Sequence, residues 1–139
     1  MGTDAYEGAV YVYALGEDGF EPGLRLAPPL PKSNYDFGMQ VALSGHRLAV
    51  SAPYEASNAT GVGGDMDNED ATDAGAVHVF ELRDNEWRHV SYVKAGNTGA
   101  GDYFGDTALA MDGETLAVGA WGEDGENDAL QDSGAIYVY

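Results

Sequence analysis

The chain has 139 residues, with 24 acidic residues against 6 lysines and arginines and a formal net charge of −18. This excess of negative charge disfavours binding to nucleic acids or to anionic membranes, because both need clustered basic side chains. Hydrophobic residues make up 44% of the chain, which excludes a disordered acidic tail, and the absence of cysteine excludes disulfides. No stretch reaches the ~18 apolar residues of a membrane-spanning helix, and we expect any secretion signal to lie outside this chain.

The first half of the chain has the pattern of short strands separated by turns. Within residues 8–13, valine alternates with tyrosine from Val10 to Tyr13, and this period of two indicates a β-strand. A turn at 16–19 leads to a second extended run that begins at Phe20. Residues 39–43 and 48–52 then predict two strands joined by a tight turn.

The second half predicts the same elements again. Residues 75–80 and 87–94 predict two strands on either side of a turn, and 107–111 and 116–120 predict a hairpin closed by Asp-Gly. A last strand is predicted at 134–139. No segment has the periodicity of an amphipathic helix.

These predicted strands belong to an internal repeat. The hexapeptide Gly-Ala-Val-Tyr-Val-Tyr at 8–13 returns in modified form at 75–80 and again at 134–139. A Phe-Gly pair that begins at Phe37 returns at Phe104. Repetition at such a period means that one supersecondary unit is used several times, with each copy packing against the next.

Four short strands in each unit of about 60–67 residues predict an all-β protein built of β-propeller blades, each a four-stranded antiparallel sheet. The chain divides into a partial blade with two strands at 8–30, a full blade at 37–94 and a blade lacking its last strand at 104–139. This amounts to about two blades plus one extra strand, whereas closed propellers have about four to eight blades. Two explanations stay open: a fragment of a longer array, or an oligomer that completes the propeller.

The repeated motifs resemble FG-GAP repeats, the blade units of the integrin α-subunit propeller and of many bacterial surface and secreted proteins. The resemblance rests on the two Phe-Gly pairs, the three hexapeptides, and Leu-Ala-Val at 48–50 and 116–118. Residues 94–105 are similar to the linker before Phe-Gly in bacterial members. The resemblance implies a β-propeller, an extracellular or cell-surface location, and a ligand-binding surface built from loops on one face.

The loops before the second and third hexapeptides share a pattern of acids when they are aligned at a spacing of 59 residues. Acids stand at alternating positions, as the oxygen ligands of a hard cation do, and one more acid stands just before each hexapeptide. No lysine or arginine occurs at 48–82, so we expect a cation or solvent to offset the repulsion. We predict calcium (Ca2+) as the cofactor. The candidate ligands are Asp65, Asp67, Glu69 and Asp73 in the first loop and Asp124, Glu126, Asp128 and Asp132 in the second.

The calcium prediction competes with a simpler one, in which both loops are solvated acidic loops of a salt-adapted protein. The loops lack the glycine and glutamate positions of an EF-hand. The integrin-type calcium loop lies between the first two strands of a blade, where the turns at 44–47 and 112–115 are too short to form it. The calcium site is therefore inferred from spacing and not from the family.

No catalytic motif occurs in the sequence. His46, His78 and His89 have no serine, cysteine or second histidine at a spacing that suggests catalysis or a zinc site, and His78 is expected on the surface of a blade. We predict a non-catalytic, secreted or cell-surface module for binding or adhesion, with calcium-stabilised loops and a protein or surface glycan as its partner. The alternative is a structural subunit that self-assembles through its edge strands into a ring or a fibre.

Overall fold

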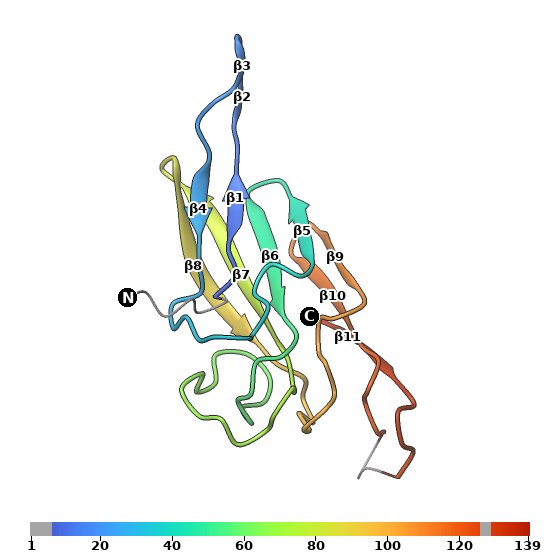
Figure 1. The fold of residues 1–139 in the computed structure, drawn as a ribbon. Coiled ribbons are helices and arrows are strands. Elements are labelled where there is room, and N and C mark those ends of the chain that lie inside the picture. The colour runs from blue at the N-terminus through green and yellow to red at the C-terminus, as the bar shows by residue number, and fades with distance from the viewer. Residues whose placement is uncertain (1–6, 126–128) are drawn as a thin grey trace, which may run out of the picture.

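The computed structural model describes residues 7–125 and 129–139. Within these residues the regular structure is β-strand in antiparallel sheets, so the predicted all-β class is confirmed. A hairpin, a four-stranded sheet and a three-stranded sheet follow one another along the chain (Figure 1). The described residues include no helix that could span a membrane.

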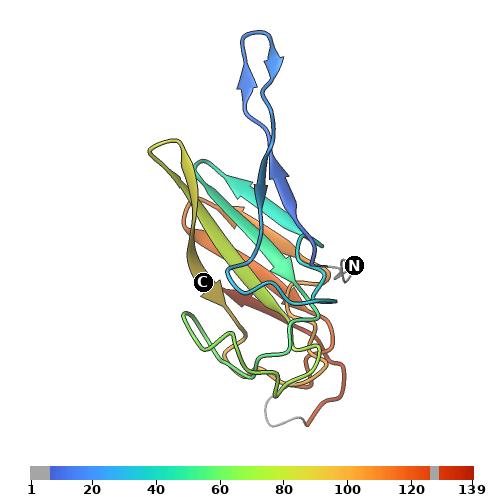
Figure 2. The ribbon, with the colours of Figure 1, turned by 60° about the vertical axis from the view of Figure 1, so that its left-hand side comes forward.

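The first unit is a long hairpin. β1 (Val10–Val12) pairs with β4 (Leu24–Leu26) at its base, and β2 (Leu15–Gly16) pairs with β3 (Gly19–Phe20) near its tip. The turn lies where glycines at 16–19 predicted it. The tip extends away from the rest of the molecule (Figures 1 and 2).

The second unit is the complete four-stranded sheet in the middle of the molecule. Its strands are β5 (Val41–Ser44), β6 (Arg47–Ala52), β7 (Ala76–Arg83) and β8 (Glu86–Val93). Each strand pairs antiparallel with the next one along the chain, in the order β5-β6-β7-β8. The pairing of β7 with β8 shifts register once, between Val79 and Phe80.

The third unit repeats the first three strands of the second. β9 (Leu109–Asp112) pairs with β10 (Thr115–Ala120), which pairs with β11 (Ala135–Val138). β9 lies beside β5 of the central sheet. β11 is an edge strand of its sheet.

The third unit also carries one extra residue between its Phe-Gly pair and its first strand. Gly119 accepts a hydrogen bond from Gly105 N (2.8 Å) and donates to Ala108 O (2.9 Å), so two residues separate its partners. One residue separates the equivalent partners of Ser51 in the central sheet. The insertion therefore forms a local bulge opposite Gly119 and leaves the register of β9 with β10 regular.

The three units stack so that both faces of the central sheet are covered (Figure 2). The core between the hairpin and the central sheet has the buried members Leu26, Phe37, Leu48, Val50, Ala52 and Phe80. The core between the central and third sheets has the buried members Ala49, Val77, Val79, Val93, Ala95, Phe104, Leu116, Val118 and Ala120. Neighbouring residues of β6 and β7 alternate between the two cores, as the period of two in a strand requires.

His78 is buried, with 4% of its surface exposed, so its predicted surface position is wrong. The residue lies on β7 between Val77 and Val79 and therefore faces the opposite core, where its ring is 5.6 Å from that of Phe37. The equivalent Tyr11 is exposed because it lies on the outer hairpin. β7 lies in the middle of the stack, and neighbouring units cover it on both sides.

Candidate functional site

Two long loops and a linker gather at one end of the stack (Figures 1 and 2). The first loop (53–75) joins β6 to β7, the second loop (121–134) joins β10 to β11, and the linker (94–108) joins β8 to β9. The linker is tied to the first loop, because Gly101 N donates to Thr72 O at 2.9 Å. We call the surface formed by these three segments the loop end.

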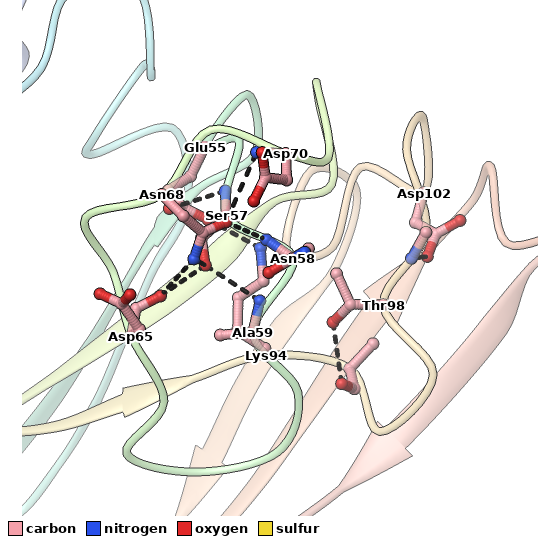
Figure 3. A network of polar contacts seen from close by, with 12 residues as sticks. Glu55, Ser57, Asn58, Ala59, Asp65, Asn68, Asp70, Lys94, Thr98 and Asp102 are labelled. Atoms are coloured by element: carbon pink, nitrogen blue, oxygen red, sulfur yellow. Dashed lines mark hydrogen bonds and ion pairs between the residues drawn. The ribbon is translucent and has the colours of Figure 1, made fainter.

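Ser57 and Asn68 hold the first loop in shape (Figure 3). The hydroxyl of Ser57 donates to the carbonyl oxygen of Asp65 (2.6 Å) and accepts from Ala59 N (3.0 Å). The amide of Asn68 donates to the same carbonyl (3.0 Å), and its oxygen accepts from Asn58 N (2.9 Å). Hydrogen bonds between uncharged groups thus close the middle of the loop onto its start.

A buried ion pair lies at the base of this loop. Nζ of Lys94 is 2.7 Å from Oε2 of Glu55, and the two side chains are 0% and 4% exposed. The other carboxylate oxygen of Glu55 accepts from Ser57 N at 3.1 Å. Both oxygens therefore have a donor, which offsets the cost of removing the charges from water. Burial lowers the pKa of Lys94, and the neighbouring Glu55 carboxylate opposes that shift.

The first loop also pairs with the outer strand of the central sheet. Val62 forms an antiparallel bridge with Val93, and Gly63 N donates to Tyr92 O at 2.8 Å. Part of the loop therefore acts as a short additional strand beside β8. Backbone hydrogen bonds of this kind fix the loop without any bound ion.

The predicted ligands of the first loop are held by protein groups. Oδ1 of Asp65 accepts from Asp67 N at 2.9 Å. Nζ of Lys32 lies 3.6 Å from Oδ1 of Asp67 and 3.1 Å from Oε1 of Glu69. The expectation that no basic side chain lies beside this loop is therefore wrong, because the segment before β5 brings Lys32 to it.

In the second loop, the chain turns around Asp124. Its Oδ1 accepts from Asp132 N at 2.7 Å, and its carbonyl oxygen accepts from Leu130 N at 2.7 Å. Asp124 and Asp132 are thus brought together through a backbone amide. Glu126 and Asp128 lie outside the described residues.

Asp73 and Asp132 share one backbone conformation. Their φ angles are 57° and 48°, in the left-handed region that aspartate tolerates better than most residues. Each stands two residues before a hexapeptide glycine, where the loop turns into a strand. The amide of that glycine in the first loop, Gly75, donates to Glu55 O at 2.9 Å.

Among the residues that the structure describes, no three histidine or acidic side chains are grouped closely enough to hold a metal ion. In the first loop the described acids bind Lys32 and a backbone amide, so a calcium ion there would have to displace these partners. Calcium binding therefore stays a prediction from the acid pattern.

Glu123 occupies the repeat position of Glu55 and is also buried, with 3% of its surface exposed. Its carboxylate accepts from Nδ2 of Asn97 (2.5 Å) and from the hydroxyl of Tyr137 (2.7 Å). Its carbonyl oxygen accepts from Gly134 N at 2.9 Å. In the third unit two uncharged donors thus bind the buried carboxylate of Glu123. In the second unit a lysine binds the equivalent carboxylate, that of Glu55.

Asp102, in the linker, is a further buried carboxyl group, with 4% of its surface exposed. Burial raises the pKa of Asp102 to about 6, the hydrogen bond from Gly99 N (2.6 Å) opposes this, and the nearby charges of Glu123 and Asp124 add to it. Asp102 therefore takes up a proton at mildly acidic pH, well above the usual range of an aspartate.

The structure brings two histidines together that the sequence did not connect. Nδ1 of His78 is 3.1 Å from Nε2 of His89 on the neighbouring strand, and the ring of Tyr92 packs beside them. Burial lowers the pKa of both histidines, that of His78 to about 3 with contributions from His89 and Lys94. Both rings are therefore neutral at pH 7 and share a part-buried hydrogen bond.

Three aromatic side chains form a row on the loop end. The rings of Trp121 and Tyr103 stack at 4.9 Å with an angle of 6°, and Tyr54 meets Tyr103 edge-on at 5.7 Å. The indole of Trp121 donates to Oδ2 of Asp106 at 2.9 Å while 47% of the residue stays exposed. Tyr103 has a φ of 52°, which is rare for an aromatic residue. The sequence signal for this row is a tryptophan where the other copy has Pro53.

Comparison with known proteins identifies the repeat. Residues 87–139, from β8 to the end of the chain, match the family model of the FG-GAP repeat. No curated protein and no solved structure matches the chain. FG-GAP repeats are non-enzymatic, propeller-type units that often serve adhesion or binding. Residues 87–139 therefore contain an FG-GAP repeat, and the Phe-Gly pairs of the chain lie at the junctions between stacked antiparallel sheets.

Proposed function

We propose that this chain is a non-catalytic binding module of a secreted or cell-surface protein, and that the loop end is its ligand-binding surface. The FG-GAP match supports this class of function, because such repeats often serve adhesion or binding. The observation that carries the proposal is the aromatic row of Trp121, Tyr103 and Tyr54, in which Trp121 is exposed and the two tyrosines are half-buried.

The row has the properties of a prepared binding surface. Trp121 is held by stacking on one side and by its hydrogen bond to Asp106, so a ligand orders little further side-chain motion when it binds. Its other face can pack against apolar groups, and its environment is rich in carboxylates. This combination suits a protein or a surface glycan that offers an apolar face together with hydroxyl or ammonium donors.

Binding to arrays of glycans and to immobilised extracellular-matrix proteins tests the proposal. We expect the wild-type chain to bind at least one class of probe and the Trp121→Ala variant to lose that binding. Tyr11→Ala is the matched control, since Tyr11 is an exposed aromatic residue on the distant hairpin. Absence of wild-type binding to every probe, or equal binding by the Trp121 variant, would contradict the proposal.

Calcium binding by the acidic loops is a separate proposal, supported by the acid pattern that the two loops share. Its test is a calorimetric titration of chelator-treated protein with calcium, using magnesium as the control. We expect saturable binding of calcium. The double variant Asp65→Asn with Asp67→Asn should weaken it, as should Asp124→Asn. Lys32→Gln should strengthen it, because this change removes a competing cation. No saturable heat would exclude the calcium site.

Self-assembly is a second candidate function, and the exposure of β11 favours it. β11 is an edge strand, and Ile136 and Val138 on it are 75% and 67% exposed. Unpaired strand edges with apolar side chains promote pairing between chains. A molar mass that rises with concentration in sedimentation, and that falls in Ile136→Lys, would support this function, and a constant monomer mass would exclude it.

A further inference from the structure

We infer that one water molecule is a structural part of this protein, bound in a cavity between the hydroxyl groups of Tyr35 and Tyr92. The cavity lies between the segment that joins β4 to β5, the central sheet and the start of the first loop. The inference goes beyond the proposed function, because it concerns a buried polar site and neither the aromatic row nor the acids of the loops.

The two hydroxyl groups are the first observation. Tyr92 lies on β8 and is 2% exposed. Tyr35 is half-buried as a residue, but its hydroxyl oxygen is closed off from solvent like that of Tyr92. Among the residues that the structure describes, neither hydroxyl has a hydrogen-bond partner. A buried hydroxyl without a partner destabilises the folded state, so both groups need one.

The two hydroxyl groups also lie in the same neighbourhood. Both residues line the same cavity. Burial raises the pKa of Tyr35 and of Tyr92, and the charge of Glu55 adds to both shifts. Tyr35 itself adds to the shift at Tyr92. One molecule placed beside Glu55 can therefore serve both hydroxyl groups.

The protein groups nearby are already used by other contacts. Ser57 lies near the hydroxyl of Tyr92, but its own hydroxyl donates one hydrogen bond and accepts two, which is its full capacity. Both carboxylate oxygens of Glu55 accept hydrogen bonds, one from Lys94 and one from Ser57 N. A solvent molecule is the partner that remains.

The size and the lining of the cavity fit one water molecule. The cavity offers about 10 Å³ to the centre of a water molecule, and a single bound water needs roughly 10–15 Å³ by this measure. A larger ligand has no room there. Cavities that stay dry have apolar walls, whereas this one is lined by two hydroxyl groups, Glu55 and His78 beside its apolar residues.

His78 supplies the third partner that a buried water commonly has. Its Nδ1 lies 3.1 Å from Nε2 of His89, which leaves Nε2 of His78 for the water. The water then joins Tyr35 of the connecting segment to Tyr92 and His78 of the central sheet. It lies close to the ion pair at the base of the first loop (Figure 3).

Oxygen-17 magnetic relaxation dispersion tests the inference directly, because it counts the water molecules that a protein holds for long times. We expect the double variant Tyr35→Phe with Tyr92→Phe to hold one such water fewer than the wild type. Tyr139→Phe is the matched control, because the hydroxyl of Tyr139 donates directly to Lys94 O at 2.6 Å. This control should hold as many waters as the wild type.

Urea denaturation of the same variants gives a second readout. Tyr35→Phe and Tyr92→Phe should each raise the unfolding equilibrium constant about two- to tenfold, because each removes a hydrogen bond to the water. The double variant should cost less than the product of the two, since both changes remove the same water.

Two results would overturn the inference. If the single variants are destabilised while the double variant keeps the wild-type number of waters, the hydroxyl groups bind protein partners directly. If either single variant is more stable than the wild type, its hydroxyl is buried without any partner, because removing an unsatisfied polar group stabilises a core.

Discussion

Glu55 and Glu123 stand at the same position of two repeat units. A comparison of the two shows which contacts are common to both units and which are specific to one unit. Both are buried, and both accept a hexapeptide glycine amide at 2.9 Å through their carbonyl oxygens. Their carboxylates differ, because that of Glu55 pairs with Lys94 whereas that of Glu123 accepts from Asn97 and Tyr137. The backbone role is thus common to both units, and the side-chain partners are specific to each.

The difference arises from the residues that surround each glutamate. Tyr137 reaches Glu123, but the equivalent His78 pairs with His89 instead, so Glu55 depends on a lysine from the end of β8. A charged partner supports the first loop, which is the longer of the two, and uncharged donors support the second. The units are therefore expected to respond differently to substitution and to pH.

Lys94→Met should give the largest effect on stability. It leaves the Glu55 carboxylate buried without its charged partner, which costs about 3–5 kcal/mol in comparable cases. Urea denaturation measures the loss. Replacing both residues, as Glu55→Leu with Lys94→Met, should recover much of it, and an equally unstable double variant would show that the ion pair is not the cause.

Glu123→Gln should cost less, about 1–3 kcal/mol, because the glutamine keeps one acceptor and meets only uncharged donors. The same denaturation experiment gives the value. A cost as large as that of Lys94→Met would remove the distinction between the two units.

Asp102→Asn should change how stability depends on pH. The pKa of Asp102 is about 6 in the folded state, above its usual value of 3.8, so the folded protein binds more protons than the unfolded chain between these values. This contribution to stability is therefore lost as pH rises from 4 to 6, and the variant should lack that loss. Subtracting the two profiles from thermal melts removes the opposite contribution of His78, whose pKa is lowered. Parallel profiles would contradict the buried, protonated state of Asp102.

Lys32→Gln should give the smallest change in stability, below about 1 kcal/mol, because Asp67 and Glu69 are mostly exposed. The effect should shrink further at high salt, where exposed charges are screened. Thermal melts at two salt concentrations measure both. A salt-independent loss of several kcal/mol would show that Lys32 has a structural role like that of Lys94.

The strands and their repetition could be predicted because they depend on local patterns. The period of two at 8–13, 75–80 and 134–139 marks strands wherever it occurs, and the hexapeptide glycines mark the junctions. The buried position of His78 was missed because burial on both faces depends on stacking, which a single strand does not reveal.

The contacts of the loop end could not be predicted, because they join distant segments without any period. Lys32 meets Asp67 across 35 residues, and Lys94 meets Glu55 across 39. Acids at alternating positions suggested that their carboxylates converge on a cation. Such carboxylates surround one point only if the loop curls around that point. In this loop the hydrogen bond between Asn68 and Ser57 fixes a different shape. The sequence signal for the buried glutamates was the spacing of 68 residues that relates Glu55 to Glu123.

Amide hydrogen exchange of metal-free protein tests most directly whether the loop end is a surface prepared by the protein itself. The amides of Gly63, Gly75 and Gly134 donate to Tyr92 O, Glu55 O and Glu123 O, so they report on the two loops separately. We expect slow exchange at all three amides in the presence of a chelator. Fast exchange in chelator that slows only when calcium is added would contradict it, and would show that the metal builds the loop end.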